Sequence, residues 1–155
     1  MAKIEALKGV YLFDQLNSAE LEKVAAIAEE KSFASGQEIF SANQVADALY
    51  VIRMGAIKIY SNSDEGEDHS IAHLASGSHF GEVSFADGGK RSATAQAVEP
   101  CHLIEIKYSH LSQLLNSDDK IAHKFYKSLS LFIAKRLRAT LGDLNQARDA
   151  KLKHF

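Results

Sequence analysis

The stretch ASGSHFGEVSFADGGKRSATA, residues 75–95, decides how this chain is interpreted. It places several glycines, one acid and one arginine between segments that otherwise look like ordinary strands. Gly81 has no Cβ, so backbone amides at the start of a short helical turn can approach an anion closely. Arg91 presents a fork of donors that matches phosphate oxygens, and Ser92 adds a hydroxyl. With Glu82 as an acceptor for a sugar hydroxyl, these residue types predict a site for a sugar and a phosphate.

A simpler interpretation of the same stretch needs no ligand. Glu82 and Arg91 can form a structural ion pair, with residues 87–90 as an exposed turn. Neither interpretation makes the site catalytic, because no second carboxylate, no metal-ligand spacing and no pair of nucleophile and base accompany these two residues. We therefore expect binding without turnover, and no enzyme.

On both sides of this stretch, apolar and polar residues alternate with a period of two, which is typical of strands. Gly55 is expected to form a tight hairpin between ALYVIRM and AIKIYS, and the polar run 61–68 should form the next turn. The expected strands are 48–54, 56–61, 69–74, 92–98 and 101–107. Short strands at such spacing predict an α+β, mainly β fold, an antiparallel jelly-roll barrel.

Helices are expected before and after the strands. Asn17 and Glu20 have the spacing of a capping box, which predicts a helix over about 18–30. A second helix of about 30 residues should begin near residue 117, because apolar residues then recur at steps of three or four. They are Ile121, Phe125, Leu129, Phe132, Ile133, Leu137, Leu141, Leu144 and Ala147, with Gly142 as a candidate bend or early end. At roughly 45 Å this helix must extend past its own domain, so its apolar stripe predicts a second copy or a neighbouring domain.

Composition limits the class of protein. A chain of 155 residues with 46% hydrophobic residues suits one compact domain. Cys101 is the single cysteine, which excludes an intrachain disulfide and an iron–sulfur cluster and favours the cytoplasm. No run approaches the ~20 apolar residues of a membrane span, so no membrane partner is expected. Residues 116–155 hold nine Lys/Arg against four Asp/Glu, which suits a solvated helix face or contact with nucleic acid.

An ordered set of motifs resembles the cyclic-nucleotide-binding domain family, which includes the catabolite activator protein and the regulatory subunits of cyclic-AMP-dependent protein kinase. The resemblance covers nearly the whole chain. The motifs are Gly36, Ile39 and Phe40, then LYVIRMGAIKIY (49–60), Gly77, FGEVSF (80–85), RSAT (91–94) and the long C-terminal helix. The resemblance implies the jelly-roll fold and a cyclic nucleotide as ligand.

The resemblance also implies roles for single residues. Glu82 would bind the ribose 2′-hydroxyl, and Arg91 and Ser92 the phosphate. Backbone at Gly81, Val83 and Ser84 would close the phosphate cradle, with Ala93 beside it.

Further residues would contact the sugar and the base. Ile59, Ile71 and Ala72 would lie near them, although plain core packing also explains these side chains. IAKRLRAT (133–140) is similar to the helix that covers the purine in bacterial cyclic-AMP receptors. Arg136 and Thr140 would then face the nucleotide, with the Thr140 hydroxyl accepting from an adenine amino group, unless both are exposed surface.

Two departures from the family pattern affect specificity and a turn. Asn43 stands where many members have a turn glycine, which asparagine tolerates because it adopts positive φ more easily than most residues. Ser92 occurs in bacterial cyclic-AMP receptors but in eukaryotic members often accompanies cyclic GMP. Cyclic AMP is the preferred ligand and cyclic GMP the alternative.

The sequence therefore predicts a cyclic-nucleotide sensor with two parts. Residues 1–116 form the binding domain with its N-terminal helix, and residues 117–155 form a helix that acts as lid and homodimer seam. The chain ends after that helix, so direct sequence-specific DNA binding is not expected. Two alternatives are a degenerate barrel that serves as an assembly scaffold and a cupin-like metalloenzyme using His69, His73, His79 and Glu82.

Overall fold

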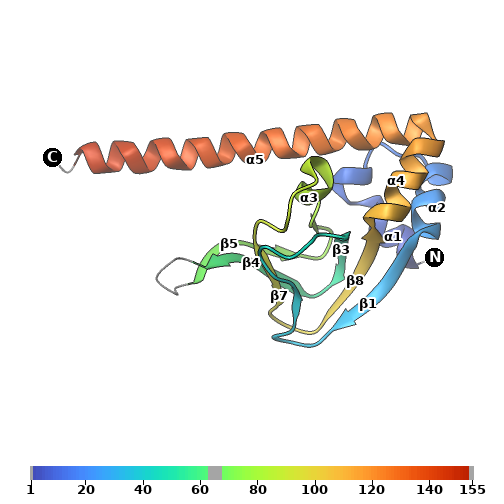
Figure 1. Ribbon diagram of the computed structural model, residues 1–155, viewed down its shortest axis with the longest axis horizontal. Helices are drawn as coiled ribbons and strands as arrows, with labels where there is room; N and C mark the ends of the chain where they lie inside the picture. Colours follow the sequence, from blue (N-terminus) through green and yellow to red (C-terminus); the bar gives the residue numbers. More distant parts are fainter. Residues whose placement is uncertain (1, 63–67, 154–155) are drawn as a thin grey trace.

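The computed structural model describes residues 2–62 and 68–153, with side chains for residues 3–61 and 72–146. Its strands form two four-stranded antiparallel sheets with the orders β1-β8-β3-β6 and β2-β7-β4-β5 (Figure 1). The strands are β1 (Ala28–Phe33), β2 (Glu38–Phe40), β3 (Ala48–Met54), β4 (Ala56–Asn62), β5 (Asp68–Ala75), β6 (His79–Phe80), β7 (Thr94–Ala97) and β8 (Cys101–Lys107). The fold is of the predicted jelly-roll type, although the pairings among the described strands do not close the two sheets into one barrel.

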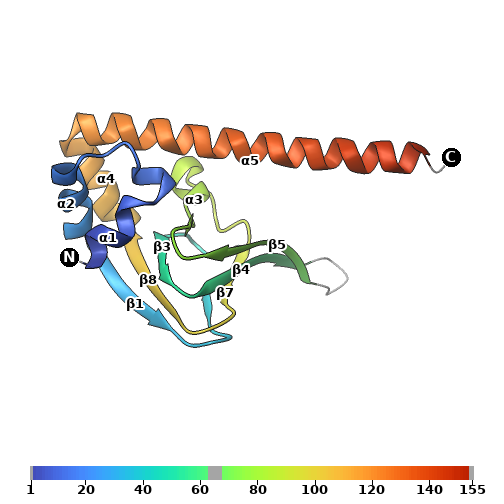
Figure 2. The same cartoon turned by 180° about the vertical axis from the view of Figure 1, so that it is seen from behind.

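Helices cover one end of the sheets (Figure 2). They are α1 (Ala2–Lys8), the 3-10 turn η1 (Tyr11–Phe13), α2 (Ser18–Ala26), α3 (Val83–Asp87), α4 (Tyr108–Ser117) and α5 (Asp119–Lys153). Both views show α1, α2 and α4 together at this end, with α5 running from there past α3 and beyond the sheets. The predicted long helix is therefore confirmed, and it continues through Gly142 instead of ending there.

Two apolar clusters lie on opposite faces of β3. Leu49 and Val51 pack against the helices, whereas Tyr50 and Ile52 face the second sheet. Successive strand residues point to opposite faces of the sheet. Because both faces of β3 are buried, nearly every position of the strand must be apolar. The unbroken apolar run at 48–52 follows from this burial.

The predicted hairpin at Gly55 is wrong. β3 pairs with β6 and β8, whereas β4 pairs with β5 and β7, so Gly55 is a corner at which the chain passes from one sheet to the other. Its φ is 106°, and a Cβ there would lie 2.6 Å from Cys101 Sγ and 2.7 Å from the Pro100 carbonyl oxygen. Only glycine fits this corner.

The next turn agrees better with prediction. β4 and β5 pair from Ala56↔Ala75 to Asn62↔Asp68, as expected for strands on either side of the polar run 61–68. The turn itself, 63–67, lies outside the described residues. Asn43 adopts a φ of 70°, the left-handed conformation expected at its turn.

The helix predicted over 18–30 is shorter than expected. Its capping box is present: the Asn17 side chain accepts from the Glu20 N–H at 2.9 Å, and the Glu20 carboxylate accepts from the Asn17 N–H at 2.9 Å. The helix nevertheless ends at Ala26, and β1 pairs with β8 from Ala28 onward. Sheet pairing outweighs the helix propensity of residues 29–31.

Candidate functional site

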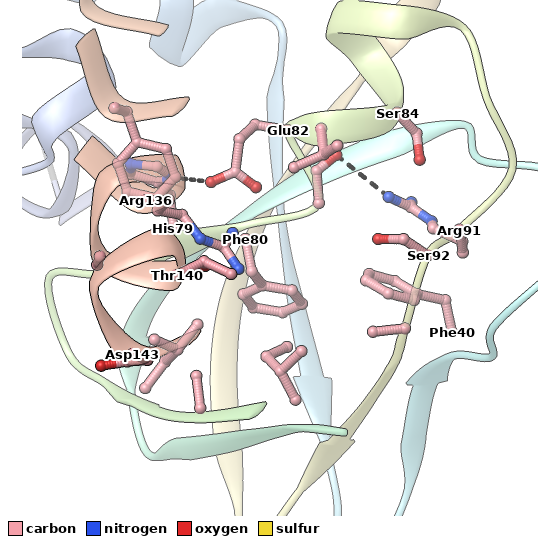
Figure 3. A pocket seen from close by; sticks show the side chains of 18 residues that line it. Phe40, His79, Phe80, Glu82, Ser84, Arg91, Ser92, Arg136, Thr140 and Asp143 are labelled. Carbon is pink, nitrogen blue, oxygen red and sulfur yellow. Dashed lines mark hydrogen bonds and ion pairs between the residues drawn. The ribbon is translucent and has the colours of Figure 1, made fainter. Parts of the chain in front are cut away.

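A pocket of about 390 Å³ lies between the sheets, the β6–α3 turn and helix α5. Every residue predicted for the site except Ile71 lines it, and the Ile71 side chain lies outside the described residues. Figure 3 shows Arg136, Thr140 and Asp143 of α5 on one side, Arg91, Ser92 and Phe40 on the other, and Glu82 with Phe80 between them. Segments far apart in the sequence thus form one concave site.

The turn between β6 and α3 forms the floor of the polar end. Gly81 has a φ of 86°, and a Cβ there would lie 2.9 Å from Arg91 Nη1 and 3.2 Å from the Ala48 carbonyl oxygen. The absence of a side chain therefore allows the guanidinium to approach the backbone. Val83 and Ser84 begin α3 directly after this turn, and the Ser84 hydroxyl donates to the Lys90 carbonyl oxygen at 3.2 Å.

Arg91 is buried and held in place by neutral groups. Its Nη2 donates to the Ala48 carbonyl oxygen at 2.5 Å, and its Nη1 donates to the Gly81 carbonyl oxygen at 3.2 Å and the Tyr108 hydroxyl at 3.1 Å. The Phe40 ring lies 3.9 Å from the guanidinium carbon, a cation–π contact.

No carboxylate neutralises this arginine among the residues that the structure describes. Arg91 is only 4% exposed, its Nε is buried without a hydrogen-bond partner, and the ion pairs of the described residues do not include it. A buried, uncompensated cation costs free energy. An anionic ligand in the pocket would remove that cost, so the site is suited to an anion.

The ion pair considered between Glu82 and Arg91 is wrong. Glu82 instead approaches His79, with Glu82 Oε1 2.6 Å from His79 Nδ1. The two atoms are close, yet the N–H and the oxygen lack the alignment of a full hydrogen bond, and both atoms are otherwise buried without partners. The carboxylate lies in the pocket wall, where it can accept a hydrogen bond from a ligand hydroxyl.

Tyr108 was missed in the sequence, although it completes the arginine cradle. Its hydroxyl donates to the Gly81 carbonyl oxygen and accepts from Arg91. Burial raises the pKa of Tyr108, with the Arg91 charge opposing this shift, so the phenol keeps the proton that it donates at neutral pH. Phe40 was known only as a family motif residue and not as a partner of Arg91.

Helix α5 supplies the opposite wall. Besides the predicted Arg136 and Thr140, it contributes Phe132, Ala139 and Asp143. Phe132, Arg136, Ala139, Thr140 and Asp143 recur at steps of one, three and four, so they share one helix face. This spacing would have identified the three missed residues once Arg136 and Thr140 were placed over the pocket.

The remaining alternatives find less support. The described residues contain no cluster of three His, Cys, Asp or Glu side chains able to hold a metal, and His79 contacts Glu82 instead of another histidine. His69 lies outside the described side chains. Within 2–62 and 68–153, no helix has both the length and the apolar character needed to cross a membrane.

The fold and site together define a class of β-domain with a pocket suited to a small anionic ligand, one wall of which comes from a C-terminal helix. The family profile described as "Cyclic nucleotide-binding domain" matches residues 30–118. This chain belongs to the cyclic nucleotide-binding domain family, which confirms the resemblance seen in the sequence.

Individual relatives agree with this assignment. The "Cyclic AMP receptor protein" of Thermus thermophilus is 30% identical over 132 residues, which cover 85% of this chain and 59% of that protein. A "cAMP-dependent protein kinase regulatory subunit" of Candida albicans is 33% identical over 59% of this chain and 19% of its own length. The crystal structure of the Thermus thermophilus catabolite activator protein superposes with a TM-score of 0.77 at 28% identity, covering 87% of this chain and 62% of that one. The chain spans about half the length of the curated bacterial regulators that it matches.

Proposed function

We propose that this chain binds a cyclic nucleotide, with cyclic AMP preferred over cyclic GMP, and acts as a sensor module. Arg91 and Ser92 bind the phosphate, Glu82 binds the ribose 2′-hydroxyl, and backbone at 81–84 closes the cradle. The observation that carries the proposal is the buried Arg91, which lines a pocket without a carboxylate partner among the described residues.

The base lies at the other end of the pocket, toward α5. Ile59 and Ala72 provide apolar contacts from the sheet, and Ile71 is proposed with them. The Thr140 hydroxyl accepts from the adenine 6-amino group, which favours cyclic AMP. The names of relatives such as the Thermus thermophilus protein support the same preference.

Ligand binding is coupled to the position of α5 in this proposal. Arg136 and Thr140 line the same pocket as Glu82, so a nucleotide that contacts all three binds best when the helix lies over it. Residues 1–116 then act as the binding domain, and residues 117–155 act as lid and dimer seam. Nucleotide should change the helix position or the oligomeric state in solution scattering, and an unchanged curve at saturation would refute the coupling.

The module binds its ligand without hydrolysing it. The relatives are mostly regulators, such as the cyclic AMP receptor proteins and a protein kinase regulatory subunit. The cytoplasm remains the location predicted from the single cysteine.

Calorimetric titration with cyclic AMP and cyclic GMP tests the proposal directly. We expect saturable binding by the native chain, tighter for cyclic AMP, and a loss of roughly 30-fold or more in Arg91→Ala, because a desolvated charge pair is broken. Arg91→Lys keeps the charge but loses the fork, so it should bind with intermediate affinity.

Arg53→Ala is the matched control. Arg53 lies on β3 outside the pocket lining and pairs with Glu30 at 2.6 Å on the surface. Its loss should leave the affinity unchanged. No heat with either nucleotide, once carry-over from expression is excluded, would show that the fold serves as a scaffold or binds another ligand.

A further inference from the structure

His79 occupies an unusual place in the pocket wall. It lies on β6, is 5% exposed, and places Nδ1 2.6 Å from Glu82 Oε1. The charged side chains that line the pocket are Glu82, Arg91, Arg136 and Asp143. Of these four, Glu82 is the one with an ion-pair contact to His79 in the part of the chain that the structure describes. The imidazole can therefore influence the position of the Glu82 carboxylate.

The histidine ring is fixed from two sides. Its backbone pairs with Val51 of β3, and its ring centroid lies 4.4 Å from that of Phe132 on α5, tilted by 58°. A ring held by a strand and a helix pays little conformational entropy to keep its Nδ1 beside the carboxylate. Glu82, by contrast, has a long side chain that is buried, and no hydrogen bond holds its Oε1 among the described residues.

The contact also divides the carboxylate into two unlike oxygens. Oε1 faces the imidazole, and Figure 3 shows the second oxygen pointing away from it. An Nδ1–H this close to Oε1 offsets part of the cost of burying the carboxylate, even without the alignment of a full hydrogen bond. The second oxygen is then left to accept from another donor.

We propose that His79 is a positioning residue for the ligand: it holds Glu82 so that its second oxygen accepts from the ribose 2′-hydroxyl. This inference rests on the proposed function, because it assumes that a ribose is bound at Glu82. It predicts that the contribution of the 2′-hydroxyl to affinity depends on a donor at position 79.

Two variants separate the donor from the ring. His79→Phe keeps an aromatic ring against Phe132 but has no N–H. His79→Asn lacks the ring but keeps an N–H near the position of Nδ1. Thermal unfolding shows whether each variant folds, and His79→Leu, which resembles Asn in shape and has no donor, replaces His79→Phe if that variant does not fold.

The measurement is the affinity of each protein for cyclic AMP and for 2′-deoxy cyclic AMP. The native chain should bind cyclic AMP about tenfold or more tightly than the deoxy ligand, because a hydrogen bond to a charged acceptor is lost. In His79→Phe the ratio of the affinity for cyclic AMP to that for the deoxy ligand should fall to about three or less. In His79→Asn this ratio should stay close to the native value.

Two results would overturn the inference while leaving the proposed function intact. One is an unchanged ratio of the two affinities in His79→Phe, whether or not both affinities fall together. The other is an Asn variant whose ratio falls as far as that of the Phe variant. A native chain that binds neither ligand would refute the proposed function, and the role of His79 with it.

Discussion

At the scale of single residues, the pocket depends on how closely the backbone approaches Arg91. Gly81→Ala should cost stability and at least tenfold in ligand affinity, because the new Cβ would lie 2.9 Å from Arg91 Nη1 at a φ of 86°. Gly36→Ala is the control: φ is 84° there, but no atom lies within 4 Å of the added Cβ. It should cost about 1–2 kcal/mol in urea unfolding and leave the affinity unchanged. Equal affinity losses in both variants would contradict this account.

Tyr108→Phe tests the support of the guanidinium. The variant removes the hydroxyl that donates to Gly81 and accepts from Arg91, so affinity should fall about fivefold to tenfold in calorimetry. Tyr50→Phe removes a comparable hydroxyl, which donates to Glu105 at 3.1 Å outside the pocket lining. This control should lower the stability and leave the affinity unchanged. If Tyr50→Phe weakens binding as much as Tyr108→Phe does, the support of Arg91 by Tyr108 does not explain the loss of affinity.

Single residues also show what could be predicted. Glu82, Arg91 and Ser92 fall within one short stretch of sequence, and their chemistry together with the surrounding pattern of glycines and strands suggested an anion site. The contacts of His79 with Phe132 and of Arg91 with Phe40 join residues far apart in the chain, so only the fold brings them together. Local sequence therefore identified residues that line the pocket but not those that hold them in place.

At the scale of elements, predictions succeeded where the signal is local. The capping box marked the start of α2, because it depends on residues three apart. The end of α2 and the corner at Gly55 were wrong, because each depends on which distant strand pairs with the next segment. The same limit applies to α5, whose apolar positions were taken as one stripe.

The faces of α5 differ in what they contact. Ile121, Phe125 and Leu129 pack in the helical core, and farther along Phe132 and Arg136 line the pocket from the same face. At about 100° per residue, Leu137, Leu141 and Leu144 lie roughly 120° around the helix from the pocket face. They are 57%, 50% and 56% exposed, so the second half of the apolar stripe does not pack against the domain.

The contact between α2 and α5 predicts a stability that depends on pH. The hydrogen bond from Lys124 at 2.6 Å, followed by the backbone bond from Asn17, holds the pKa of Glu20 below its ordinary value of 4.5. A carboxyl with a lowered folded pKa stabilises the protein above the unfolded pKa, and this contribution is lost as pH falls through the folded pKa. Glu20→Gln should therefore lower the free energy of unfolding at pH 7, and the difference from the native chain should shrink below about pH 4.5.

Urea unfolding at pH 7 and at pH 3 measures this change. Glu5→Gln is the control, because Glu5 pairs with Lys8 on the surface with 72% of its side chain exposed. It should differ little from the native chain at either pH. If Glu20→Gln lowers the free energy of unfolding equally at pH 7 and at pH 3, the shape of the side chain and not its charge stabilises the protein.

At the scale of the whole molecule, α5 carries both a wall of the pocket and an exposed apolar surface. The overhang was predicted from length alone, since a helix of about 30 residues at 1.5 Å each exceeds the size of the domain beneath, and the observed helix has 35 residues. Leu137, Leu141 and Leu144 are spaced by four and three residues, as in the seam of a coiled coil, which supports the proposed homodimer. Residues of the sheets and of α5 from the same chain line both sides of the pocket, so we expect binding and dimerisation to be separable.

Replacing the three leucines by serine should therefore convert a dimer into a monomer that still binds nucleotide. Light scattering coupled to gel filtration gives the mass, and calorimetry should show an affinity within about threefold of the native value. Leu131→Ser is the control. Leu131 is 47% exposed, but around the helix axis it lies roughly 120° from the three leucines and is not on the face that lines the pocket. A native chain that is monomeric at every concentration would refute the proposed homodimer through α5. A monomeric variant that no longer binds would show that the partner helix completes the site, and the lid would then act only within the dimer.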